Sequence, residues 1–140
     1  MSPSLTEILT GAAAAMMSPP SPDAGPAYAA SRLGMVGMMT MLAAQEAERG
    51  PAAALAENAA IRALFAEAGA YDADGALAKA AAETDADFSG SGLDRANADL
   101  RNLLIALHER VEDAGDRAMD RRILALYCDM AHGRKLSLGR

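Results

Sequence analysis

The side chains best suited to nucleophilic chemistry lie near the end of the sequence. Cys128 and His132 are spaced i, i+4, so on one helix the histidine could act as the base that activates the thiol. Leu126, Tyr127 and Met130 surround this cysteine, however, and a lone cysteine among apolar residues is typical of a small buried side chain. We therefore predict that Cys128 is buried and inert and that the chain has no catalytic residues.

The spacing of metal-binding residue types is incomplete. The segment "HERVE", residues 108–112, lacks the second histidine of a helical zinc site. A di-iron bundle needs two Glu-x-x-His pairs, whereas Asp129 and His132 supply a single Asp-x-x-His pair, and Ile105 stands three residues before His108. These spacings predict no tightly bound metal and no cofactor, with His108 at the boundary between core and water.

The least polar stretch is "RLGMVGMMTMLAA", residues 32–44, which carries no charge after Arg32 and contains four methionines and two glycines. A helix with apolar residues on all sides predicts a central element that its neighbours surround. Two alternatives stay open: the helix could form the seam of a homodimer, or Arg32, Met35, Met38 and Met39 could line a pocket for an acyl or other apolar, possibly anionic ligand. We expect Arg32 to pair with a carboxylate of this chain, because a guanidinium beside apolar residues needs an acceptor.

The same stretch is a poor membrane span. Residues 24–44 have about the length that crosses a bilayer, roughly 20 residues. Arg32 would then lie near the centre of the bilayer, at a cost of about 2.5 kcal/mol or more. We therefore expect no membrane partner.

The composition predicts an all-α protein, because 35 of the 140 residues are alanine and only 4% are aromatic. We expect one domain over residues 1–140, a bundle of five or six helices with a proline-rich connector at 18–26. The first four helices are expected over residues 5–17, 27–49, 52–68 and 74–84. Ser91 is expected to cap a fifth that Gly115 ends, and a sixth to cover residues 117–131. Gly50 and Pro51 predict a tight corner between the second and third helices.

Apolar residues at spacings of three and four predict which helix faces form the core. The expected core residues after residue 50 are Leu55, Ile61, Leu64, Phe65, Ala68, Leu77, Ala80, Ala81, Leu100, Leu103, Leu104, Leu107, Val111, Met119, Ile123, Leu126, Tyr127 and Met130.

The charge and the cysteine content restrict the partners and the compartment. The net charge is −6 and there is no tryptophan, which argues against nucleic-acid binding. One cysteine cannot form an internal disulfide, and the first residues lack the basic region of a secretion signal. We therefore expect a cytoplasmic location.

The stretch "YAASRLGMVGMMTMLAAQEAERGPAAALAENAAIRALF", residues 28–65, resembles a bacterial all-helical family of unknown function. Its members are encoded near proteins like acyl-CoA dehydrogenases and aminoglycoside phosphotransferases. The resemblance implies an accessory role. We accordingly predict a non-catalytic accessory or interaction module that self-associates as a homodimer. A small-molecule binding protein is the alternative, and an enzyme of unknown type is the second alternative.

Overall fold

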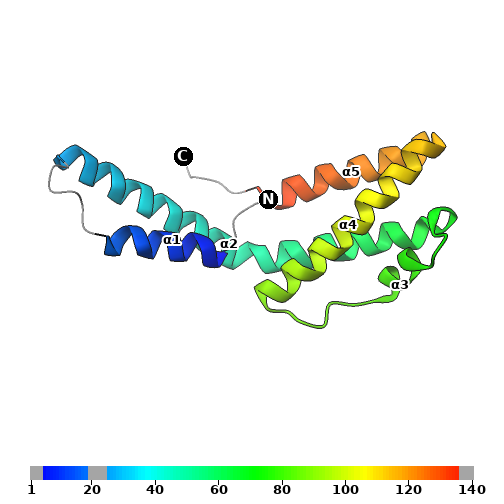
Figure 1. Ribbon diagram of the computed structural model, residues 1–140, viewed down its shortest axis with the longest axis horizontal. Coiled ribbons are helices and arrows are strands. Elements are labelled where there is room, and N and C mark those ends of the chain that lie inside the picture. Colours follow the sequence, from blue (N-terminus) through cyan, green and yellow to red (C-terminus); the bar gives the residue numbers. More distant parts are fainter. Residues whose placement is uncertain (1–4, 19–24, 136–140) are drawn as a thin grey trace. The chain divides into compact units, whose positions relative to one another are not determined.

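The computed structural model describes residues 5–18 and 25–135, which form five α-helices and no strand. The helices are α1 (Leu5–Met17), α2 (Pro26–Glu67), α3 (Ala76–Ala82), α4 (Gly90–Ala114) and α5 (Arg117–Gly133), and a short 3-10 helix, η1 (Gly69–Tyr71), follows α2 (Figure 1). The predicted all-α fold with five or six helices is confirmed. Among the described residues, no helix combines the length and the apolar character needed to cross a membrane.

Gly50 and Pro51 do not form the predicted corner. The two helices expected over residues 27–49 and 52–68 are one helix, α2, with Pro51 in its interior. Proline lacks the N–H that would bond to the carbonyl of Ala47. The alanine-rich turns on both sides nevertheless favour helix. The Gly-Pro pair still marks a boundary, because the chain divides there into two compact units.

The N-terminal unit comprises the described residues 5–18 and 25–49, and the C-terminal unit comprises Gly50–Lys135. Helix α2 contributes residues to both. The prediction of one domain over residues 1–140 is not tested by this division and stays a prediction. Most of the expected connector at 18–26 lies outside the described residues, which resume at Gly25.

The C-terminal unit holds most of the buried apolar side chains. Helices α4 and α5 form an antiparallel hairpin (Figure 1), and the C-terminal part of α2 and helix α3 complete the core. Its buried members are Ile61, Leu64, Phe65, Ala68, Leu77, Ala80, Leu100, Leu104, Leu107, Val111, Ile123 and Met130. All of them were expected from the helical spacing. The expected core residue Leu55 is only partly buried and lies outside this core, whereas Leu93, which is buried, was not expected.

Capping groups fix where α4 begins and ends. Ser89, and not the predicted Ser91, is the N-cap, and its hydroxyl accepts a hydrogen bond from the N–H of Gly92 at 3.1 Å. The helix ends at Gly115, whose φ of 68° places it in the left-handed region that glycine adopts without strain. The N–H of Asp116 bonds to the carbonyl of Val111, and that of Gly115 to Glu112, the pattern of a Schellman motif.

Asp116 joins the α4–α5 corner to η1. Its carboxylate accepts hydrogen bonds from the N–H groups of Ala118 and Met119, which starts α5, and from the hydroxyl of Tyr71 at 2.8 Å. These bonds, above all that from the Met119 N–H, hold the pKa of Asp116 below its ordinary value. Arg110 donates to the carbonyl of Tyr71 at 2.8 Å. The corner and η1 are therefore held together by polar contacts beside the core.

We expect Gly92→Ala to destabilise the chain by about 1 kcal/mol. A Cβ on Gly92 would overlap the side chain of Asp87, which accepts a hydrogen bond from the N–H of Ser89 at 2.9 Å. Gly90→Ala is the matched control, since nothing lies within 4 Å of its Cβ position, and alanine should there be neutral or stabilising. Urea unfolding followed by circular dichroism compares the two, and equal stabilities would contradict the prediction.

Candidate functional site

Arg32, in the N-terminal unit, bonds to backbone carbonyls and not to a carboxylate as we expected. Its Nη2 donates to the carbonyl of Ala15 and, at 2.7 Å, to that of Ser18. Both carbonyls lie at the C-terminal end of α1, where backbone acceptors have no partner within the helix. A guanidinium there also interacts favourably with the helix dipole. Arg32 therefore holds α1 alongside α2 in this unit.

The methionines of α2 are not enclosed in a core, contrary to our expectation of a central helix. Met35 and Met38 are 57% and 44% exposed. Met39 is half-buried and faces α1, with its Cε 3.6 Å from the position of a Cβ on Gly11. The prediction that Met35 and Met38 are core residues is wrong, because α1 covers only one side of α2 in this unit.

A small pocket beside Arg32 is the nearest match to the predicted ligand site. Its volume is about 230 Å³, below the roughly 300–1,000 Å³ typical of ligand sites. It is lined by Ala15, Met16, Ser18, Ala29, Arg32, Leu33 and Val36. Of the four predicted ligand residues, only Arg32 lies in this pocket. Ligand binding by Arg32, Met35, Met38 and Met39 together stays a prediction that this geometry does not favour.

Buried polar side chains in the C-terminal unit form a cluster that the sequence analysis missed. Glu57 and Asn58 come from α2 and Asn97 from α4, and all three are buried. The Nδ2 group of Asn97 donates to Glu57 Oε1 and to Asn58 Oδ1, both at 2.9 Å. Buried polar groups of this kind need such partners, because an unpaired one costs about 1–3 kcal/mol.

An arginine from the end of α5 completes this cluster. Arg134 donates through Nε to Glu57 Oε2 at 2.7 Å and through Nη2 to Asn97 Oδ1 at 2.9 Å. A second arginine, Arg101, lies 3.9 Å from Glu57 Oε1. The negative charge of the buried Glu57 is thereby balanced, as a buried carboxylate requires.

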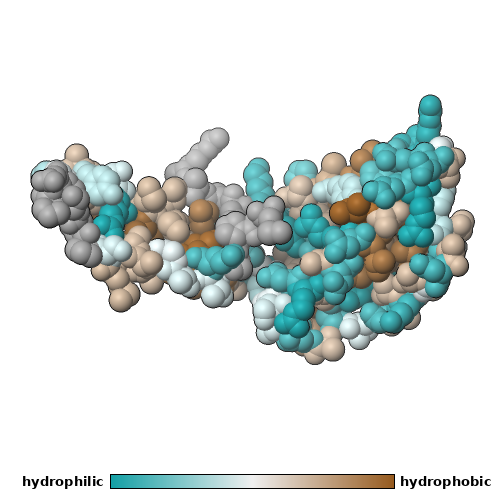
Figure 2. All heavy atoms as spheres, viewed as in Figure 1, coloured by the Kyte–Doolittle hydropathy of each residue, from teal (hydrophilic) through white to brown (hydrophobic). Residues whose placement is uncertain are grey.

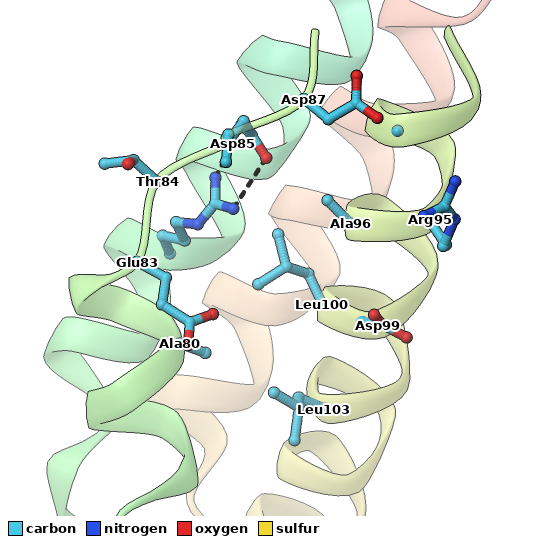
Figure 3. Close-up of a pocket in the computed structure, with 13 residues that line it drawn as sticks. Ala80, Glu83, Thr84, Asp85, Asp87, Arg95, Ala96, Asp99, Leu100 and Leu103 are labelled. Atoms are coloured by element: carbon cyan, nitrogen blue, oxygen red, sulfur yellow. Dashed lines mark hydrogen bonds and ion pairs between the residues drawn. The ribbon is translucent and has the colours of Figure 1, made fainter. Parts of the chain in front are cut away.

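Asn58 connects this cluster to a buried ion pair. Its Nδ2 donates to Asp85 Oδ1 at 3.0 Å. Arg62 donates through Nη1 and Nη2 to the two carboxylate oxygens of Asp85, both at 2.9 Å (Figure 3). The two bonds from Arg62 hold the pKa of Asp85 below its ordinary value, and the bond from Asn58 acts in the same direction. Arg134, Glu57, Asn97, Asn58, Asp85 and Arg62 thus form one continuous polar chain, which joins α2, α4, the end of α5 and the α3–α4 loop.

A groove of about 320 Å³ lies beside the Arg62–Asp85 pair. Its walls are the α3–α4 loop, α4 and Arg62, with Leu100 and Leu103 below and Asp87, Arg95 and Asp99 around it (Figure 3). Among the described residues, Arg62 Nε is the one buried side-chain N or O atom without a hydrogen-bond partner. The lining includes no cysteine or histidine that could act as a nucleophile or a base, and its charged groups of both signs show no preference for one ligand class.

One sequence signal could have revealed part of the polar chain. Asn97 stands in the apolar stripe of α4, four residues after Leu93 and three before Leu100, and Asn58 stands three residues before Ile61. A polar residue at a core position indicates a buried hydrogen-bond partner. The stripe does not say which residue that partner is, because Asn97 and Glu57 are 40 residues apart.

The candidates for nucleophilic chemistry do not form a site. Cys128 is exposed, so the prediction that it is buried is wrong. His132 approaches the backbone carbonyl of residue 128 at 2.7 Å through Nδ1, and no bond joins it to the thiol. The prediction for His108 is confirmed, because its side chain is 17% exposed.

No protein-family profile, curated protein or solved structure matches this chain. The resemblance of residues 28–65 to a bacterial helical family therefore stays an expectation.

Proposed function

We propose that this protein is a non-catalytic interaction module that self-associates through its N-terminal unit. The observation that supports this is the distribution of exposed apolar side chains. Of the eleven large exposed hydrophobic side chains among the described residues, eight belong to the N-terminal unit: Leu9, Met16, Met17, Tyr28, Leu33, Met35, Met38 and Met41. Teal hydrophilic residues are widespread on the visible face of the C-terminal unit, whereas tan, brown and pale residues predominate over α1 and the start of α2 (Figure 2).

The N-terminal unit buries little of its own apolar surface. Its buried hydrophobic residues are Ala12, Val36 and Ala43, two of which are alanines. A pair of helices of this size needs additional burial, because below about 40 residues a chain segment seldom folds without a metal, a disulfide or oligomerisation. Residues 5–49 contain no cysteine and no histidine, so neither a disulfide nor a structural zinc site of the Cys/His type can supply it. Oligomerisation is the remaining route.

The spacing along α2 suits a helical seam. Met35, Met38 and Leu42 follow one another at intervals of three and four, the spacing of apolar positions in a heptad. Gly34 and Gly37 have no atom within 4 Å of a Cβ position, so another helix could approach closely there. Helix α1 packs on a neighbouring face of α2, where Val36 and Ala43 are buried.

A second copy of this chain is the occupant that we propose for this surface. The stretch after Arg32 is uncharged up to Gln45, so it offers no charge pattern that would select a different protein partner. The α1–α2 pair of one copy and that of a second copy would together form a four-helix bundle, which would bury the exposed apolar face of each copy. We place this homodimer in the cytoplasm and assign it an accessory role, in keeping with the resemblance of residues 28–65.

Sedimentation velocity on the full chain tests the proposal. We expect a dimer at micromolar concentration, and we expect Met35→Glu together with Met38→Glu to weaken it at least about tenfold, because a carboxylate would be buried at the seam. Ile105→Glu is the matched control. Ile105 is 52% exposed on α4 in the other unit, and its replacement should leave the dimer unchanged.

Two outcomes would reject this function. A parent chain that stays monomeric at high concentration would show that the exposed apolar surface is not a homodimer seam. Equal loss of the dimer in the control would place the interface in the C-terminal unit. If the monomeric parent instead bound a fluorescent anionic apolar probe, and Arg32→Ala abolished that binding, the small-molecule alternative would replace self-association.

A further inference from the structure

Three side chains capable of binding a metal meet where α4 ends and α5 begins. His108 and Glu112 stand one helical turn apart near the end of α4, and Asp120 lies in the first turn of α5. One ligand atom from each of the three lies within 4.8 Å of the other two. All three belong to the C-terminal unit, outside the polar chain and both pockets.

The distances suit a small divalent cation. His108 Nε2 lies 2.9 Å from Asp120 Oδ1 and 3.9 Å from Glu112 Oε1. A zinc ion holds nitrogen and oxygen ligands at about 2.0–2.2 Å, so ligand atoms around it are roughly 3.3 Å apart. The side chain of Glu112 is 64% exposed and can rotate freely, so a small adjustment would bring all three atoms to equal distances from one ion.

The two carboxylates have no competing cation. Among the described residues, no lysine or arginine forms an ion pair with Glu112 or Asp120, whereas Glu57, Glu67 and Asp85 each pair with an arginine. Asp120 Oδ1 is hydrogen-bonded to Nε2 of His108, and Glu112 Oε1 lies 3.9 Å from the same nitrogen. The three possible ligand atoms therefore face one another. The ring centroids of Tyr127 and His108 lie 5.6 Å apart, so the imidazole packs against a neighbouring side chain of α5.

We propose that His108, Glu112 and Asp120 form a binding site for a divalent transition-metal ion of the zinc type. One imidazole and two carboxylates are a borderline-to-hard donor set that suits zinc and its neighbours and leaves at least one coordination position to water. The ion would link α4 to α5 across their turn. This proposal is independent of self-association, and it revises the expectation of no metal, which considered spacing within one helix only.

Calorimetric titration of the full chain, without a histidine tag, with zinc chloride tests the site. We expect one zinc per chain, and a higher melting temperature with zinc than without it, because the ion binds only the folded arrangement. Glu112→Gln should weaken binding at least about tenfold and abolish most of the thermal shift. Because Glu112 is exposed, this variant should fold like the parent. His108→Gln and Asp120→Asn should have the same effect on binding.

The chain offers a matched control in its other pair of potential zinc ligands. Cys128 and His132 are both exposed and lie one turn apart on α5, so Cys128→Ser combined with His132→Gln should leave binding unchanged. Loss of binding in this control would assign the zinc to α5 alone and overturn the proposal. Absence of saturable binding in the parent would also overturn it and would leave His108 and Asp120 as a simple interhelical hydrogen bond.

Discussion

Replacing Asn97 with leucine is expected to lower the free energy of unfolding by about 2–5 kcal/mol, because two buried acceptors lose their donor at about 1–3 kcal/mol each. Leucine has nearly the same shape, so the loss comes from polar groups and not from a cavity. Three hydrogen bonds disappear at once, those with Glu57, Asn58 and Arg134. The side chain of Glu57 is 3% exposed, so its Oε1 would lose its short-range donor without gaining water.

Urea unfolding followed by circular dichroism measures this effect, with all proteins at the same concentration so that self-association contributes equally. Asn102→Leu is the control, because Asn102 is exposed on the same helix and its replacement should change stability by less than about 0.5 kcal/mol. Similar stabilities for the two variants would show that the polar chain does not hold α2 and α4 together.

Asp85→Asn is expected to destabilise the chain by about 3 kcal/mol at neutral pH, because it leaves Arg62 poorly paired. The side chains of Arg62 and Asp85 are only 14% and 7% exposed, so water replaces little of what is lost. The variant keeps the size and shape of the side chain and removes its charge. The effect therefore reports the ion pair rather than packing.

The same pair predicts how stability depends on pH. Because the pKa of Asp85 is lower in the folded chain than its ordinary value of 3.8, its contribution is fully present above that value. The contribution is lost as the pH falls through the folded pKa, since protonation then breaks the pair. The difference in unfolding free energy between the parent and Asp85→Asn should accordingly shrink as the pH falls below 3.8 and disappear once the pH has passed the lower, folded-state pKa.

Asp99→Asn is the control for this series. Asp99 lines the same groove and is exposed, so its replacement should change neither the stability at neutral pH nor its acid dependence. A difference between the parent and Asp85→Asn that stayed constant down to acid pH would contradict the ionic explanation.

The helical class and the core of the C-terminal unit follow from local properties of the sequence. Alanine favours helix wherever it stands, and Leu100, Leu104, Leu107 and Val111 repeat at the helical period, so they share one face whatever packs against it. The α4–α5 turn was equally predictable, because Gly115 supplies a left-handed residue. These features depend on neighbours only a few residues away.

Features that depend on what lies opposite a helix could not be predicted. The apolar residues of α2 are compatible in the sequence with a core, a dimer seam or a pocket, and only the packing of the described residues shows Met35 and Met38 to be exposed. The sequence predicted that Arg32 donates hydrogen bonds to some acceptor. Only the packing of α1 against α2 determined that these acceptors are carbonyls at the end of α1. At Pro51 the helical preference of both flanks prevailed over the local turn signal.

The polar chain and the proposed zinc site of the C-terminal unit both depend on tertiary structure. Asn97 meets Glu57 across 40 residues of chain, and His108 meets Asp120 only because Gly115 turns α5 back along α4. The sequence by itself determined which residues form helices and which faces of the C-terminal helices are apolar, since both depend on short-range periodicity. Only the tertiary structure decided which polar side chains meet, because a helical period carries no information about the register between two helices.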